Sequence, residues 1–407
     1  MKFGVRAVII SAGFAASFAW AAPDEDILGK RDGYPVCKDQ VGRIEQNCLV
    51  GNLSHYDEIS PARVVKASGK PRTFRHVTKE PAIRYANGNV DTFLAANRNT
   101  GLLILKGDTL LVERYQYDRR PEHRFQSYSM AKTVVAMLIG IAIADKKILS
   151  VDDMADQYVP ELRGHPYGET KLRDLLTMSS GVAFSERYDG QDDVTTLARA
   201  TLMQQGEGGV RSVLPFANRE RPAGTKFSYA SAETEVLSLV LHNATGKHLA
   251  DYLSEKIWIP MGAEADATWL IDAGGNELGF MGLNATLRDW GRLGMLMANG
   301  GKANSAPDSP QIIPASWVKE MTSVHGPHLA RGTATRFNGY GYQTWLIGKT
   351  ENAFALFGVR GQSVFVDPET KLVIVHTAVF GSFDPSQRND QFGLFFGTLQ
   401  SLKQIEL

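Results

Sequence analysis

The sequence predicts a mixed α/β protein (α+β), in which one antiparallel sheet is built from both ends of the chain. Apolar runs typical of strands occur at 101–115 and again between 340 and 378, while the patterns between them are mainly helical. We therefore expect flanking helices and a sheet lobe made of residues 76–128 and 335–407. Residues 129–334 are expected to form an inserted helical lobe.

Length and composition exclude several classes of function. The chain has 407 residues, 43% of them hydrophobic, which is enough for a large core. Lys plus Arg and Asp plus Glu both number 44, so the net charge is zero. This balance gives no electrostatic case for nucleic acid or an anionic membrane as partner, and favours a small-molecule substrate. It leaves the oligomeric state open.

The first residues have the pattern of an export signal. Lys2 and Arg6 precede an apolar stretch at 7–18, and Ala19-Trp20-Ala21 is an A-x-A cleavage site. The apolar stretch is short for a membrane span, although an uncleaved anchor is an alternative. We expect a signal peptide over residues 1–21, a periplasmic location and no stable membrane insertion.

Residues 22–75 show little periodicity and predict an irregular extension. Cys37 and Cys48 lie in this segment and are the two cysteines of the chain. In an oxidising compartment we expect them to form a disulfide, with two free thiols as the alternative. No histidine nearby has the spacing of a metal site, so no metal is expected.

The main body opens with a predicted hairpin at 101–115, whose turn is Lys106-Gly107-Asp108. Strands are predicted again at 340–347, 353–359 and 362–378, followed by an amphipathic closing helix at 389–402. The hairpin leads to a segment that is apolar almost all round from Val134 onward, which indicates a helix buried in the core.

Ser129 and Lys132 stand at the start of this buried helix. Their spacing places both side chains on one face, one turn apart, near the unpaired backbone N–H groups. Desolvation lowers the pKa of a lysine, so Lys132 can accept the proton of Ser129 near neutral pH. The same spacing recurs at Ser316 and Lys319, where a plain cap on a surface helix explains it.

A second group of polar residues precedes another predicted helix. Pro222 and Gly224 mark a tight turn, and Tyr229 lies just before the helix at 233–241. A phenol there can act as acid or base, with its pKa lowered by a neighbouring ammonium. The alternative is a tyrosine that packs its ring and donates one hydrogen bond.

These segments together resemble the ordered signature of the serine β-lactamase-related superfamily. The resemblance is carried by Ser129-x-x-Lys132, by Leu172-Arg-Asp-Leu-Leu-Thr-Met-Ser-Ser-Gly181 and by Pro222-Ala-Gly-Thr-x-Phe-x-Tyr229-x-Ser231. It is closest to the class C branch, with its esterases, D-amino-acid peptidases and 6-aminohexanoate-dimer hydrolases, and covers roughly residues 76–400. It implies a β-lactamase-like fold.

The resemblance also implies roles for individual residues. Ser129 would be the acylated nucleophile, Lys132 its proton acceptor, and Tyr229 the group that protonates the leaving group and activates water. Ser231 stands where the family usually has an asparagine that contacts substrate. Tyr188, in a polar loop, is expected to line the cleft.

A third family motif is expected on a strand beside the nucleophile, and we place it at Val359-Arg360-Gly361. Gln362 would then donate its backbone N–H, with that of Ser129, to an oxyanion hole, and Gly361 would contact substrate. In β-lactam-handling relatives a cation and a hydroxyl on this strand hold the substrate carboxylate. Val359 offers neither, and Arg360 is expected to point away from the cleft.

The acidic loop that contains Tyr188 also contains Asp192 and Asp193, which we expect to be solvated, with a substrate-ammonium site as the alternative.

These observations predict an exported serine hydrolase that cleaves amide or ester bonds of small or peptide-like substrates through an acyl-enzyme, with no metal or organic cofactor. One alternative is a β-lactamase or D-alanyl peptidase. Another is a non-catalytic ligand-binding relative, which has no need of a deacylating phenol at Tyr229.

Overall fold

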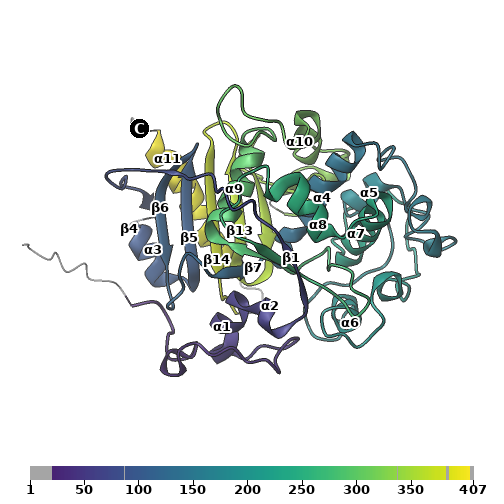
Figure 1. Ribbon diagram of the computed structural model, residues 1–407, viewed down its shortest axis with the longest axis horizontal. Helices are drawn as coiled ribbons and strands as arrows, with labels where there is room; N and C mark the ends of the chain where they lie inside the picture. Colours follow the sequence, from purple (N-terminus) through teal and green to yellow (C-terminus); the bar gives the residue numbers. More distant parts are fainter. Residues whose placement is uncertain (1–20, 87, 337, 382–384, 404–407) are drawn as a thin grey trace, which may run out of the picture.

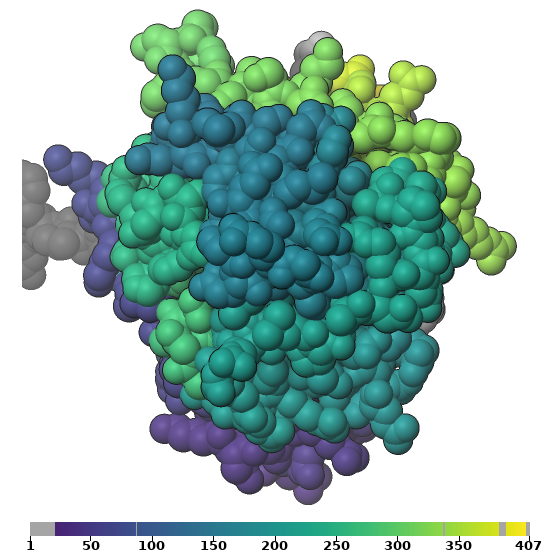
Figure 2. Space-filling view, turned by 90° about the vertical axis from the view of Figure 1, so that its right-hand side faces the viewer, coloured from purple at the N-terminus to yellow at the C-terminus, as the bar shows by residue number. Residues whose placement is uncertain are grey.

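The fold was analysed in a computed structural model, which describes residues 21–86, 88–336, 338–381 and 385–403. The predicted signal peptide, apart from Ala21, lies outside the described residues. Figure 1 shows a sheet with helices packed against it and, to the right of the sheet, a mainly helical lobe. Figure 2 faces that lobe, whose teal residues cover most of the view, with the purple N-terminal segment along its lower edge.

The main sheet has eight strands in the order β10-β11-β12-β13-β14-β5-β6-β2, and its neighbours are antiparallel except for β2 and β6. The strands are β2 (Arg75–His76), β5 (Asn99–Lys106), β6 (Thr109–Tyr115), β10 (Gly339–Tyr340), β11 (Trp345–Leu346), β12 (Phe354–Gly358), β13 (Gln362–Asp367) and β14 (Leu372–Ala378). The central pairing of β14 with β5 joins the two ends of the chain, which confirms the predicted fold class.

Along β5, apolar side chains point alternately to the two faces of the sheet, which explains why helices cover both faces. Leu103 and Leu105 belong to the core shared with the helical lobe, whereas Leu102 and Ile104 belong to a second core. The covering helices are α3 (Val90–Ala96) and α11 (Pro385–Leu402) on the second core, and α9 (Leu287–Ala298) on the first. A Cβ added at Gly291 of α9 would lie 2.6 Å from the side chain of Leu103, so glycine allows this close packing.

The helical lobe is built around two long buried helices, α4 and α7, which pack against each other. Its α-helices are α4 (Met130–Ala144), α5 (Leu172–Leu176), α6 (Asp193–Ala200), α7 (Ser231–Thr245), α8 (Leu249–Leu253) and α10 (Ala315–Met321). The short helical turns are η3 (Ala155–Gln157), η4 (Pro160–Leu162), η5 (Gly209–Ser212), η6 (Ser254–Trp258) and η7 (Pro327–Leu329).

A second sheet, which the sequence did not predict, lies between the lobes. It is antiparallel, with strand order β1-β8-β9-β7. Its strands are β1 (Ala62–Val65), β7 (Arg124–Gln126), β8 (Ala267–Leu270) and β9 (Leu283–Thr286). Because β7 ends three residues before Ser129, this sheet fixes where α4 begins. A separate two-stranded ladder joins β3 (Arg84–Tyr85) and β4 (Gly88–Asn89).

The N-terminal segment is more ordered than its composition indicates. It contains η1 (Lys30–Asp32), η2 (Gln46–Cys48), α1 (Leu49–Ser54) and α2 (Tyr56–Ile59), and it contributes β1 to the second sheet. Cys37 and Cys48 form the predicted disulfide. The Tyr56 hydroxyl donates to the Val41 carbonyl, and Asp57 forms an ion pair with Arg124 of β7. The segment is therefore integrated with the body of the protein.

Within the described ranges, no helix combines the length and the apolar character needed to cross a membrane.

Replacing Cys37 and Cys48 together by serine should lower the free energy of unfolding by about 3 kcal/mol, because the bridge restricts the unfolded chain. The denaturation midpoint of the variant, at unchanged slope, should fall below that of the wild type. Reductant should reproduce the loss in the wild type and leave the variant unchanged. Equal midpoints for oxidised wild type and variant would contradict the prediction.

Candidate active site

Ser129 occupies the N-cap position of α4, and its side chain makes no capping hydrogen bond. Tyr128, immediately before it, has φ 43°, in the left-handed region that non-glycine residues rarely adopt. Every residue from Met130 to Ala142 is buried. The start of α4 is thus fixed by a tight turn and by burial of the whole helix behind it.

Lys132 is almost fully buried one turn into α4. Its Nζ lies 2.9 Å from Ser129 Oγ, 3.0 Å from Ser231 Oγ and 3.0 Å from the carbonyl oxygen of Phe280. Burial lowers the pKa of Lys132 to about 8, although the carboxylates of Glu186 and Glu235 act in the opposite direction. About a tenth of such an amine is neutral at pH 7, and this fraction, which rises with pH, can accept a proton.

Tyr229 lies beside this pair, in the residues before α7. Its ring stacks on Trp345 at a centroid distance of 5.5 Å, and Lys132 Nζ lies 5.0 Å from its ring centre. Burial, followed by the nearby Glu186 carboxylate, raises the pKa of Tyr229, against the opposing effect of a hydrogen bond with Ser129. The predicted lowering of the Tyr229 pKa is therefore wrong, because burial is the largest influence on it. Tyr229 is a neutral phenol, suited to donate a proton.

Ser231, the first residue of α7, links Lys132 to a carboxylate that the sequence analysis missed. Its backbone N–H donates to Glu186 Oε2 at 2.8 Å, and its hydroxyl donates to Glu186 Oε1 at 3.0 Å. The carboxylate thus lies at the N-terminus of α7, where unpaired N–H groups and the helix dipole favour a negative charge. Glu186 lies in a polar loop without periodicity, and nothing in its local sequence indicated this contact.

The loop that carries Glu186 is held by Asp192. Asp192 is 2% exposed, and its carboxylate accepts the backbone N–H groups of Arg187, Tyr188 and Thr195. The predicted solvated character is therefore wrong for Asp192, which caps α6; Asp193 accepts from Ser185. Tyr188 is 41% exposed and donates its hydroxyl to Glu186 Oε1 at 2.5 Å, which places it at the edge of the site.

The glycine that packs beside the nucleophile differs from the predicted one. A Cβ added at Gly358, the last residue of β12, would lie 2.4 Å from the Ser127 carbonyl oxygen. Gly361 instead packs against Phe380, and the Gln362 side chain is hydrogen-bonded to Ala378 of β14. After Gly358, the residues Val359–Gly361 (η8) form a tight turn. This turn brings Gly361 and the Gln362 side chain toward β14.

Arg360 contacts the segment that follows β14. Its Nη1 donates to the Phe380 carbonyl at 3.2 Å. Ser316, in the second S-x-x-K, is exposed in the first turn of α10, which confirms the predicted surface helix. The predicted cap is wrong, because Pro314 holds the N-cap position.

Two buried glutamates of α7 hold loops around the site. The Gly279 N–H donates to Glu235, which positions the carbonyl of Phe280 beside Lys132. Glu233 accepts from the backbone N–H and hydroxyl of Ser180. Burial raises the pKa of each glutamate to about 8, so both are largely protonated at neutral pH.

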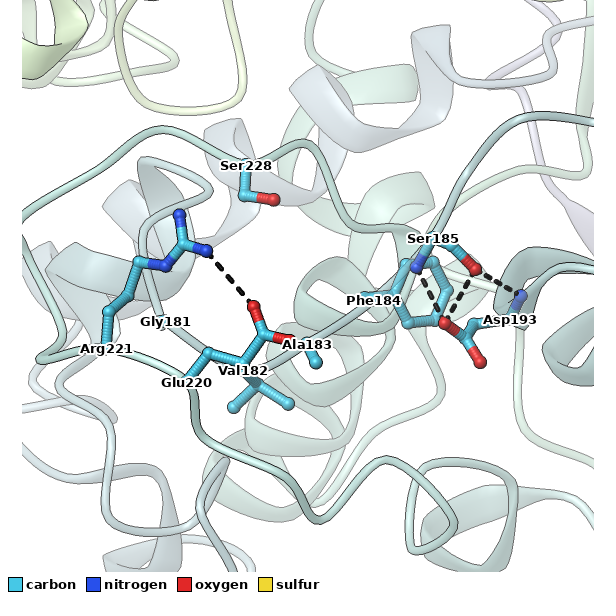
Figure 3. Close-up of a pocket in the computed structure, with 9 residues that line it drawn as sticks. All are labelled: Gly181, Val182, Ala183, Phe184, Ser185, Asp193, Glu220, Arg221 and Ser228. Atoms are coloured by element: carbon cyan, nitrogen blue, oxygen red, sulfur yellow. Dashed lines mark hydrogen bonds and ion pairs between the residues drawn. The ribbon is translucent and has the colours of Figure 1, made fainter.

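A surface cavity of about 280 Å³ lies near the Glu186 loop (Figure 3). It is lined by Gly181, Val182, Ala183, Phe184, Ser185, Asp193, Glu220, Arg221 and Ser228. Neither Ser129 nor Lys132 lines it, and its charged groups are engaged in the Glu220–Arg221 and Ser185–Asp193 contacts drawn in the figure.

The sheet, the helical lobe and the grouping of Ser129, Lys132 and Tyr229 define a β-lactamase-like architecture. A model of the beta-lactamase family matches residues 87–388, most of the chain, and the chain belongs to this family. Its relatives include 6-aminohexanoate-dimer hydrolases, the branch that the sequence resembles.

The comparisons cover most of each chain. The 6-aminohexanoate-dimer hydrolase of Paenarthrobacter ureafaciens is 26% identical over 340 residues, 82% of this chain and 85% of the relative. A solved Bacillus anthracis structure, provisionally assigned the same activity, has TM-score 0.79 and 24% identity over 89% of this chain and 96% of its own. A penicillin-binding protein from Bacillus halodurans has TM-score 0.58 and 16% identity, over 76% and 99% of the two chains. The two structures show that the fold is shared.

Glu233→Gln should make the protein progressively more stable than the wild type as pH rises from about 5 to about 9. The folded-state pKa of Glu233 is raised from 4.5 to about 8, so its stabilising contribution is complete below the unfolded pKa and is lost as pH rises through the folded pKa. The slope for one such group is at most about 1.4 kcal/mol per pH unit. Denaturation midpoints of both proteins across this range measure it, and a pH-independent difference would contradict it.

Proposed function

We propose that this protein is a serine hydrolase that cleaves amide bonds of small linear substrates through an acyl-enzyme at Ser129. The observation that carries the proposal is the buried Lys132 amine, 2.9 Å from Ser129 Oγ and held by two further acceptors. The family is one of hydrolases, and the Paenarthrobacter relative hydrolyses a 6-aminohexanoate dimer by its name.

In the proposed reaction, neutral Lys132 takes the proton of Ser129 as Oγ attacks the substrate carbonyl. Tyr229, a neutral phenol, gives its proton to the leaving amine as the carbon–nitrogen bond breaks, and regains one from the protonated Lys132. Water then attacks the acyl group, and Lys132, in place of Tyr229, accepts its proton. As the ester bond to Ser129 breaks, Lys132 returns this proton to Ser129 Oγ, which restores both groups. This cycle uses only protons already held by these three groups and by water.

The oxyanion needs two donors, and we propose the backbone N–H of Ser129 and that of Val359. Val359 follows Gly358, the glycine in contact with the Ser127 carbonyl, so it replaces Gln362 in this role. Ser231 and Tyr188 remain candidates for substrate contact through their positions beside Glu186.

The walls around Tyr229 favour an apolar substrate chain. Four aromatic rings are partly exposed here, and the ring of Trp345 contacts each of the other three: Phe227, Tyr229 and Phe357. A small-molecule amide or ester with an aliphatic acyl group fits such a surface. The disulfide and the N-terminal signal pattern further support an exported, periplasmic enzyme.

A second candidate function, β-lactam hydrolysis or D-alanyl peptidase activity, is favoured by the likeness to a penicillin-binding protein fold. Against it, Val359 stands where β-lactam-handling relatives have a cation, and Arg360 Nη1 donates to the Phe380 carbonyl.

An active-site-directed fluorophosphonate should label the peptide that contains Ser129. Ser129→Ala should abolish labelling and lower hydrolysis by about three orders of magnitude or more, because the nucleophile is lost. The assay is mass spectrometry of the labelled digest, together with kcat/KM for a p-nitrophenyl ester. Ser316→Ala is the matched control, since it removes the exposed serine of the second S-x-x-K. Labelling at Ser316 would refute the assignment.

We also expect turnover of short linear amides and activated esters to exceed that of penicillins and cephalosporins. Loss of one charge-assisted contact to the β-lactam carboxylate lowers affinity by about ten- to a hundredfold. Measuring kcat/KM for a p-nitrophenyl ester, a linear amide and nitrocefin on one preparation makes the comparison. If nitrocefin were by far the best substrate, the cleft would have to bind the substrate carboxylate through other residues.

A further inference from the structure

Glu186 stands at the end of a chain of hydrogen bonds that runs to the proposed nucleophile. The chain passes from Glu186 to the Ser231 hydroxyl at 3.0 Å, from there to Lys132 Nζ at 3.0 Å, and on to Ser129 Oγ at 2.9 Å. Three segments distant in sequence supply its members: the 186 loop, the start of α7 and the start of α4. The donor and the acceptor of each bond in this chain follow from the number of hydrogens that each group carries.

A neutral lysine amine has two N–H groups and one lone pair. One N–H of Lys132 must go to the Phe280 carbonyl, which can only accept. The single hydrogen of the Ser231 hydroxyl goes to Glu186, so Ser231 presents a lone pair toward Lys132 and takes the second N–H. Only the lone pair of Lys132 then remains, and it faces Ser129 Oγ.

We propose that Glu186 is a positioning residue that, by fixing the Ser231 hydroxyl as an acceptor, turns the lone pair of Lys132 toward Ser129. The inference rests on the proposed function, since it assigns Lys132 as the base. Without the carboxylate, the Ser231 hydroxyl is free to donate to Lys132 and to occupy the lone pair that Ser129 needs. Glu186 therefore acts through Ser231 and touches none of the reacting atoms.

The carboxylate has a second effect, through charge. Glu186 and Glu235 both raise the pKa of Lys132 against the dominant effect of burial. The other titratable groups facing Glu186 are phenols: Tyr188 donates to it, and the pKa values of Tyr167, Tyr229 and Tyr340 are raised in part by its charge. Removing this charge should lower the pKa of Lys132, so the amine becomes neutral at a lower pH.

The test is the rate at which a fluorophosphonate phosphonylates Ser129 Oγ, with loss of fluoride, measured on the full chain from about pH 6 to about pH 10. In the wild type the rate should rise with pH as Lys132 loses its proton. Glu186→Gln should lower the alkaline plateau by about 10- to 100-fold and shift the midpoint of the rise to lower pH. Glu186→Asp, which keeps the charge on a shorter side chain, should lower the plateau with less displacement of the midpoint.

The matched control is Asp189→Asn, which removes an acid from the same loop, where Asp189 pairs with Arg187 at the surface. It should leave plateau and midpoint unchanged. Because Glu186 acts through Ser231, the double variant Glu186→Gln/Ser231→Ala should have a plateau within about twofold of that of Ser231→Ala alone.

An unmoved midpoint in Glu186→Gln, a plateau equal to that of the wild type, or additive losses in the double variant would each overturn the proposal. Failure of the wild type to label at Ser129 would instead refute the proposed function, so the two failures are distinguishable. Circular dichroism of each variant separates loss of folding from loss of positioning, and Glu186→Asp still tests the proposal if Glu186→Gln does not fold.

Discussion

Burial of one amine is the constraint on which the rest of the site depends. A lysine side chain deprived of water must find hydrogen-bond partners inside the protein, and Lys132 finds them on three separate segments. Ser129 comes from the turn after β7, Ser231 from the start of α7, and the Phe280 carbonyl from a loop tied to Glu235. Three segments that are distant in the sequence therefore meet at a single nitrogen atom.

Features encoded locally were predictable from the sequence. The hairpin of β5 and β6 follows from its turn chemistry, and α4 follows from an uninterrupted apolar run. The pairing of Ser129 with Lys132 is also local, because one helical turn separates them. By contrast, the second sheet assembles four short strands from three distant regions of the chain, and a strand of three or four residues has too little periodicity to be detected.

The site departs from the sequence-based expectations wherever long-range packing decides the chemistry. Burial is the main influence on the pKa of Tyr229, and the ring that stacks on it, Trp345, is more than a hundred residues away in the sequence. Gly358 and Gly361 are both plausible from spacing alone, and only the path of the tight turn between them shows which one meets the nucleophile. The contact between Glu186 and Ser231 could be predicted only by knowing which loop covers the N-terminal end of α7.

The incorporation of β1 into the second sheet has a consequence for the order of folding. Arg63 of β1 forms an ion pair with Glu277, which lies 214 residues further along the chain. Pairings of such long range are slow to form, because a long loop must close before any contact is gained. β1 is therefore synthesised long before β8, the strand with which it pairs, and it cannot pair until most of the polypeptide has been made. The surroundings of Ser129 include this sheet through β7. We therefore expect them to be completed in the last stage of folding.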